Sequence, residues 1–71
     1  MFPNGLINKM CRIYMNDRNE VTGKVLRITG GWVEMATNLE EPLIPDAYIN
    51  IAQITYVVKI TSETEDYYGI F

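Results

Sequence analysis

Apolar and polar side chains alternate along the first half of the chain, in the two-residue period of strands that bury one face. Residues 10–16, MCRIYMN, alternate so that Cys11 and Ile13 share a face. A longer alternating segment, residues 20–29, has Gly23 in its middle, where a bulge or a sharp bend is built. The pattern predicts two strands, of which the second is strongly curved.

A third alternating segment and two later ones complete the predicted strands. Residues 32–37 follow two glycines, and Trp32 begins this segment on its polar side. Residues 38–46, NLEEPLIPD, contain two prolines and three acids and predict an exposed loop. Strands resume at residues 47–51 and 54–60, which are rich in Ile, Val and Tyr and have one tight turn between them.

Five short strands, with no helix longer than about two turns, predict an all-β fold in the form of a small, strongly bent, SH3-like open barrel. The curved second strand pairs at both of its ends in this interpretation. Residues 1–61 make up the barrel domain, and residues 62–71 an acidic and aromatic tail. Two interpretations of the tail remain open. It is either a frayed terminus or a segment that docks onto a neighbouring subunit through Tyr67, Tyr68, Ile70 and Phe71.

The small size of the chain leads us to expect a stabilising cross-link or partner. A domain of 71 residues buries only about 60% of its unfolded surface, so its stability alone is marginal. Cys11 is the one cysteine and there is no histidine, which excludes an intramolecular disulfide and a structural zinc site. Because 48% of the residues are apolar, we expect part of this surface to be shared between chains in an oligomer.

Charge is divided unevenly along the chain. The net charge is −3, which argues mildly against coating nucleic acid through phosphates. Residues 1–27 carry five bases and two acids, whereas residues 28–71 carry one base and seven acids. The start of the chain lacks a basic region before a long apolar run, and no segment approaches the roughly 20 apolar residues of a membrane span. We therefore expect a soluble, cytoplasmic protein that does not contact membranes.

Catalytic chemistry has no visible basis in the sequence. There is no histidine, no phosphate-binding glycine loop, and the lone Cys11 lies in the middle of a predicted strand, where it reads as a small core residue. Glu40 and Glu41 are adjacent carboxylates, and a solvated acidic turn is a simpler explanation for them than a metal site. We expect no enzyme activity, no metal and no cofactor.

Two residues have both a structural and a functional interpretation. Trp32 follows Gly30 and Gly31, so its indole either packs against the barrel end or a subunit, or forms a rigid platform on which a base stacks. Asn50, at a strand end, either bonds its own turn backbone or, if it lies beside Trp32, reads a base edge. Tyr14 has the same ambiguity, and packing on the sheet is the favoured interpretation.

The order of these segments resembles the Sm/LSm family, which includes the bacterial Hfq proteins. LINKMCRIYMNDRNEVTGKVLRITGGWVEM is similar to the first Sm motif, with Glu20, Val21, Gly23 and Val25 at matching places, and YINIAQITYV is similar to the second. Together they cover about two thirds of the chain. The resemblance implies a five-stranded, Sm-like bent barrel that assembles into rings and binds RNA, with a base stacked at the position of Trp32 and another contact at Asn50.

The chain departs from the family pattern at several places. Arg18 stands where a turn glycine is common, and GGWVE replaces the pattern of Asp, any residue, an aromatic residue or His, Met and Asn. Asn50 and Ile51 replace the usual Arg-Gly pair, so the base-contacting arginine is missing. The amino-terminal helix of the family is cut to about a turn. These departures favour a rival hypothesis, in which the same barrel is a structural or protein-interaction module without a nucleic-acid ligand.

The two last predicted strands give a direct physical reason to expect that the chain assembles into an oligomer. Residues 47–51 and 54–60 carry apolar or aromatic side chains on both faces, so as sheet edges they would need a strand from another subunit. Head-to-tail pairing closes into a homo-oligomeric ring, of about five to seven chains for barrels of this type. We expect this ring to bind single-stranded RNA, or DNA, through Trp32, Asn50, Gly31, Arg12, Arg18, Lys24 and Arg27.

Overall fold

The alternating segments form strands, and the computed structural model describes residues 2–61 and 63–69 of the chain. Six antiparallel strands make one open sheet, accompanied by two 3-10 turns of three residues each. The elements in chain order are η1 (Asn4–Leu6), β1 (Met10–Met15), β2 (Glu20–Thr29), β3 (Trp32–Ala36), β4 (Ala47–Asn50), η2 (Ile51–Gln53), β5 (Ile54–Ile60) and β6 (Glu65–Tyr68). The all-β class predicted from the sequence is confirmed.

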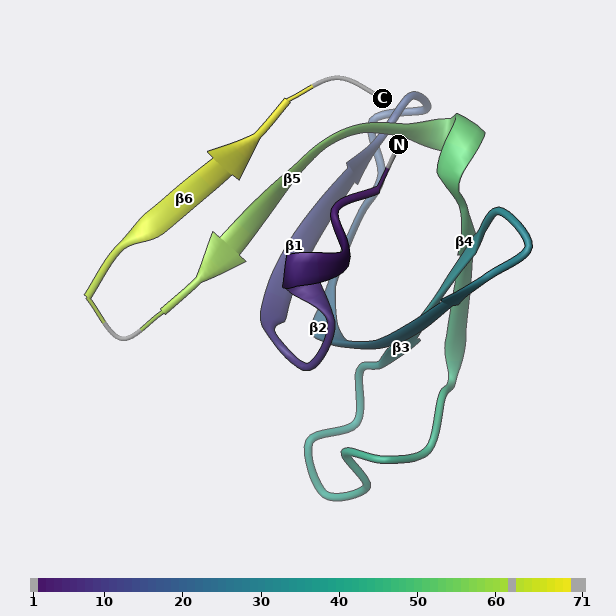
Figure 1. The fold of residues 1–71 in the computed structure, drawn as a ribbon, viewed down its shortest axis with the longest axis vertical. Coiled ribbons are helices and arrows are strands. Elements are labelled where there is room, and N and C mark those ends of the chain that lie inside the picture. Colours follow the sequence, from purple (N-terminus) through teal and green to yellow (C-terminus); the bar gives the residue numbers. More distant parts are fainter. Residues whose placement is uncertain (1, 62, 70–71) are drawn as a thin grey trace.

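Strand β2 organises the sheet, whose order is β4-β3-β2-β1-β5-β6 (Figure 1). Its first half pairs with β1 and its second half with β3. The pairing with β3 shifts register between Val25 and Arg27, and Gly23 lies where an added Cβ would be 2.6 Å from the Ala36 carbonyl oxygen. The curved strand that pairs at both ends is therefore confirmed, and it bends where β3 crosses close to its backbone.

The tail corrects two predictions. The sheet has six strands where five were expected, and residues 54–60 are not at an edge of it. Residues 65–68 of the tail form β6, which pairs with β5 from Val57↔Tyr68 to Ile60↔Glu65. β5 is consequently an interior strand of the chain's own sheet, and the edges are β4 and β6. Ile70 and Phe71, which one of the two interpretations of the tail placed against a neighbouring subunit, lie outside the described residues.

The hydrophobic core fills the concave side of the sheet. Alternate residues of β1 to β5 are buried there, and Cys11 and Ile13 are completely covered. Burial raises the pKa of the Cys11 thiol to about 11, which keeps it protonated and confirms its role as a small core residue. Phe2 and Leu6, beside and within η1, belong to the same core. Sequence analysis missed these two residues because they flank a Pro-Asn-Gly turn.

Arg18 adopts the left-handed conformation for which the sequence had suggested a glycine, with a φ of 72° in the turn between β1 and β2. This conformation costs an L-residue roughly 1–2 kcal/mol. We expect Arg18→Gly to raise the free energy of unfolding by about 0.5–1 kcal/mol, since the entropy that glycine loses on folding offsets part of the gain. Urea unfolding monitored by circular dichroism measures the change. Arg18→Ala removes the same charge but keeps the strain, so an equal gain in Arg18→Ala would refute the explanation.

Candidate nucleic-acid interface

Trp32 lies on a hairpin turn where three strands meet. It opens β3 opposite Thr29 of β2 and opposite Asn50 of β4. Gly30 and Gly31 have φ values of 54° and 84°, which few other residues adopt, and the Ile51 N–H donates to the Gly31 carbonyl at 2.9 Å. The turn is therefore tied to η2, and the Trp32 side chain it presents is 45% exposed.

Gly30 and Gly31 are needed for the shape of the turn and not for space around it. An added Cβ at Gly30 or Gly31 would meet no other atom within 4 Å, so neither glycine allows a close approach of backbone to the core. Their value is conformational, because the positive φ values turn the chain sharply into β3.

Asn50 satisfies parts of both of its interpretations. Its Oδ1 accepts a hydrogen bond of 2.9 Å from the Ala52 N–H and caps η2, which confirms the structural role. It is also the direct cross-strand partner of Trp32, so the two residues do lie side by side. Its Nδ2 makes no hydrogen bond with a residue in the described part of the chain. A donor beside an exposed aromatic ring is thus present.

The next row of the sheet places a base, an acid and an aromatic residue beside this pair. Arg27 pairs with Glu34 and Glu34 pairs with Tyr48, on the same face as Trp32. The Nε of Arg27 donates to Oε1 of Glu34 at 2.7 Å, and this hydrogen bond lowers the pKa of the Glu34 carboxyl. Tyr48 is 58% exposed. Sequence analysis missed Tyr48, although its position two residues before Asn50 in a strand places it on the same face.

The other predicted phosphate contacts lie elsewhere. Arg12 pairs with Thr22, far along β2 from Thr29, and its Nη1 is 3.4 Å from the Tyr14 hydroxyl and 3.9 Å from Glu65 Oε2. Lys24 is opposite Met10, and Arg18 lies in the turn between β1 and β2. The structure thus brings together Gly31, Trp32, Asn50 and Arg27, whereas Arg12 and Lys24 lie further along the sheet. The turn that carries Arg18 contacts η2, because Asn16 Nδ2 donates to the Ala52 carbonyl at 3.2 Å.

A tyrosine cluster covers the convex side of β1, β5 and β6. Tyr14 and Tyr56 stack with their ring centroids 4.5 Å apart, and Tyr67 lies 6.1 Å from Tyr56. Desolvation, followed by the neighbouring Tyr14, raises the pKa of Tyr56. The favoured interpretation of Tyr14, packing on the sheet, is confirmed.

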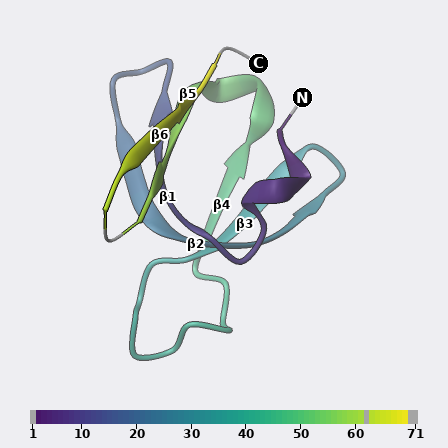
Figure 2. The same ribbon diagram turned by 60° about the vertical axis from the view of Figure 1, so that its left-hand side comes forward.

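The loop between β3 and β4 extends away from the sheet (Figures 1 and 2). Asp46 closes its base by accepting hydrogen bonds of 2.8 Å from the Thr37 N–H and from Thr37 Oγ1, and these bonds lower the pKa of the Asp46 carboxyl. The large apolar side chains of the loop are each more than half exposed: Leu39, Leu43 and Ile44. Exposed apolar side chains that lie together on a surface are typical of sites that contact another protein.

Neither a pocket nor a metal-binding group of histidine, cysteine or carboxylate residues occurs in the described ranges, 2–61 and 63–69. Those ranges also include no helix with the length and apolar character needed to cross a membrane. Trp32 is exposed on the surface, where a flat ligand could lie against its ring. Comparison of the chain with family models, with curated proteins and with solved structures gave no match.

Proposed function

We propose that this chain is an Sm-like, ring-forming protein that binds single-stranded nucleic acid, chiefly RNA, on the surface around Trp32. One observation carries the proposal: an exposed indole, held on a tight turn by Gly30 and Gly31, lies directly opposite Asn50. Single strands bind to rigid aromatic platforms because every base has a flat face to stack, and each stacked base contributes about 1–3 kcal/mol.

The groups around Trp32 supply the remaining contacts. Asn50 Nδ2 donates to an acceptor on the edge of the stacked base, while its Oδ1 stays bonded to Ala52 and holds the amide in place. Tyr48, on the same face of the adjacent strand, offers a second aromatic ring. Arg27 binds Glu34 through Nε, and its terminal nitrogens are the groups that would bind a phosphate.

Repetition gives these small sites a useful affinity. A net charge of −3 opposes the approach of phosphates, and Glu34 compensates part of the Arg27 charge, so one site alone is weak. In a ring of about five to seven copies, a strand bound at one site reaches the next at high effective concentration. Affinity then falls as salt rises, to the extent that phosphates are contacted.

Trp32→Ala tests the stacking role. We expect the substitution to weaken binding of short U-rich or A-rich RNA by about 1–3 kcal/mol per engaged base. Because Trp32 is the only tryptophan, quenching of indole fluorescence reports binding by the unsubstituted protein, and anisotropy of labelled RNA compares it with the variant. Single-stranded DNA of the same sequences establishes whether the ribose matters.

Trp32→Phe is the matched control, since it keeps an aromatic face and should retain most of the binding. Light scattering on each variant establishes that the assembly is intact. The absence of binding at low salt, or Trp32→Ala binding as tightly as the unsubstituted chain, would refute the stacking role. Dissociation of Trp32→Ala into monomers would assign the indole to packing instead.

A second candidate function rests on the loop between β3 and β4. Its exposed Leu39, Leu43 and Ile44 favour a protein-interaction module that has the same barrel and no nucleic-acid ligand. The two functions differ in what accompanies the purified protein. Material absorbing at 260 nm that is lost with Trp32→Ala supports the first function, and its absence together with no RNA binding supports the second.

A further inference from the structure

The connection between β3 and β4 is longer than the sheet requires. β3 ends at Ala36, β4 begins at Ala47, and Met35 of β3 pairs directly with Ala47. Two antiparallel neighbours are commonly joined by about two to five residues, whereas residues 37–46 form this connection. Figures 1 and 2 show that the loop extends away from the sheet. A loop that exceeds what closure of a hairpin needs is a common place for function.

The exposed aliphatic side chains of the described residues are concentrated on this loop. Leu39, Leu43 and Ile44 are 66%, 76% and 55% exposed, and the other large apolar residues with comparable exposure are aromatic. Single apolar residues are scattered over any protein surface, but these three lie within residues 39–44. Apolar side chains gathered in this way are typical of a surface that another molecule covers.

Hydrogen bonds within the loop restrain its backbone while these side chains stay exposed. Asn38 Oδ1 accepts from the Glu40 N–H at 3.0 Å, and the Asn38 carbonyl accepts from the Glu41 N–H at 3.0 Å. The Glu41 carbonyl in turn accepts from the Ile44 N–H at 3.2 Å. Two prolines restrict the same segment further. Because a restrained loop loses little entropy on binding, its contacts contribute more fully to affinity.

The charge of the loop selects the chemistry of its partner. All three charged residues of the loop are acids, and residues 28–58 contain no lysine or arginine. Neither Glu40 nor Glu41 forms an ion pair with a described residue. Lys24, which pairs across the sheet with the last residue of β3, is not ion-paired with either of them. Carboxylates beside apolar side chains attract bases and repel the phosphates of nucleic acids and anionic lipids.

We propose that the loop between β3 and β4 is a docking surface for a basic amphipathic helix of another protein. The apolar face of the helix covers Leu39, Leu43 and Ile44, and its lysines or arginines pair with Glu40 and Glu41. Burial of the aliphatic side chains supplies most of the affinity. The exposed ion pairs contribute chiefly to the choice of partner.

This inference rests on the loop of the second candidate function and names the partner of that function. It is also compatible with nucleic acid at Trp32, because Trp32 begins β3 and the loop follows the other end of the same strand. A strand of this length separates the two surfaces by roughly 15 Å. A helix on the loop and a base on the indole can therefore be bound together.

Methyl signals in the NMR spectrum of the intact chain locate the contact. The probe is a synthetic peptide of leucine and lysine with leucines at helical spacing, and a leucine and glutamate peptide of the same pattern is its matched control. We expect the lysine peptide to shift the signals of Leu39, Leu43 and Ile44, while those of the buried Leu6 and Ile13 stay in place. The glutamate peptide should leave all of these signals unchanged.

Leu43→Ser combined with Ile44→Ser tests the apolar part of the surface. Both side chains are more than half exposed, so the variant should keep the fold, and a denaturant midpoint equal to that of the original chain checks this. Its affinity for the lysine peptide should fall about tenfold or more, because two aliphatic side chains no longer become buried on binding.

Glu40→Gln combined with Glu41→Gln tests the charge. Two exposed ion pairs are lost in this variant, so its affinity for the lysine peptide should fall about two- to tenfold at low salt. Added salt should then weaken binding less than it does for the original chain, since fewer charges remain to be screened.

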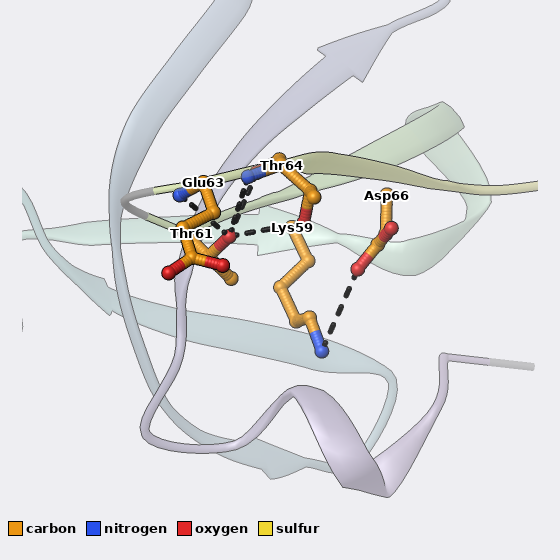
Figure 3. A network of polar contacts seen from close by, with 5 residues as sticks. All are labelled: Lys59, Thr61, Glu63, Thr64 and Asp66. Carbon is orange, nitrogen blue, oxygen red and sulfur yellow. Dashed lines mark hydrogen bonds and ion pairs between the residues drawn. The ribbon is translucent and has the colours of Figure 1, made fainter.

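Glu20→Gln combined with Glu63→Gln is the matched control, because it removes the same charge away from the loop. Figure 3 shows Glu63 in the turn between β5 and β6, where its N–H donates to Thr61 Oγ1 at 3.3 Å. Neither carboxylate forms an ion pair with a described residue, whereas Asp66 in the same view pairs with Lys59 and is unsuitable as a control. The control variant should bind the lysine peptide as tightly as the original chain.

The outcomes separate this inference from the functions proposed above. If the glutamate peptide shifts the loop signals as readily, the loop is a contact surface but the basic partner is wrong. If the control variant loses as much affinity as the loop variant, the attraction belongs to the whole acidic chain and the docking site is refuted. If neither peptide shifts the loop signals, the docking surface fails, and phosphatidylcholine vesicles that shift them instead would assign the loop to a lipid surface. Binding of RNA at Trp32 is measured separately and survives each of these results.

Discussion

Phe2→Ala is expected to cost about 3–5 kcal/mol of unfolding free energy, the usual range for removing a buried phenylalanine. The side chain is 2% exposed and belongs to the core cluster that includes Ile13 and Val57. A chain of 71 residues has a total stability of only about 4–11 kcal/mol, so this loss leaves the variant close to its unfolding threshold. Urea unfolding followed by circular dichroism and Trp32 fluorescence measures the difference.

Leu39→Ala is the control for Phe2→Ala. Leu39 is also a large apolar residue, but it is 66% exposed in the loop between β3 and β4, so its truncation should change the stability by no more than about 0.5 kcal/mol. Equal effects of the two substitutions would mean that the amino-terminal segment does not close the core. Leu6→Ala should fall in the range for buried leucine, about 2–5 kcal/mol, if η1 and Phe2 act together as a lid.

The strands with one apolar face were predictable from the sequence, whereas β6 was not. Residues 10–15, 20–29 and 32–36 lie within the predicted segments because burial of one face imposes the two-residue period that alternation reveals. β6 has no buried residue to impose such a period, and its two acids form ion pairs with Arg12 of β1 and Lys59 of β5. Those partners become visible only once β5 and β6 are seen together.

The candidate interface was also predictable only in part from the sequence. The neighbouring positions of Trp32 and Asn50 follow from hairpin pairing and agree with the expectation from the Sm-like resemblance. The bond between Arg27 and Glu34 depends on the register shift after Val25, and no alternation pattern reveals such a bulge. The distance of Arg12 and Lys24 from Trp32 along the sheet has a related cause, because the net charge of a sequence does not say where on the folded sheet a base lies.

Gly23→Ala is expected to destabilise the protein by about 1–3 kcal/mol, although alanine is ordinarily the better residue within a strand. The new Cβ would lie 2.6 Å from the Ala36 carbonyl oxygen, 3.1 Å from the Ala36 carbonyl carbon and 3.2 Å from the Thr37 Cα. All three atoms are backbone, so β2 and β3 must separate at the bend before the methyl group fits. The gain from stiffening the unfolded chain, about 0.4–1 kcal/mol, is smaller than this cost.

Gly5→Ala separates the effect of crowding from the general effect of replacing glycine. A Cβ at Gly5 meets no atom within 4 Å, so this variant should be as stable as the original chain or slightly more stable. Denaturant midpoints for the two variants provide the comparison. A Gly23→Ala protein that matches Gly5→Ala would show that β3 does not constrain the bend of β2. A loss of stability confined to Gly23→Ala would show that this one close approach determines the curvature of the sheet. The same curvature determines where Trp32 lies, at the far end of β2.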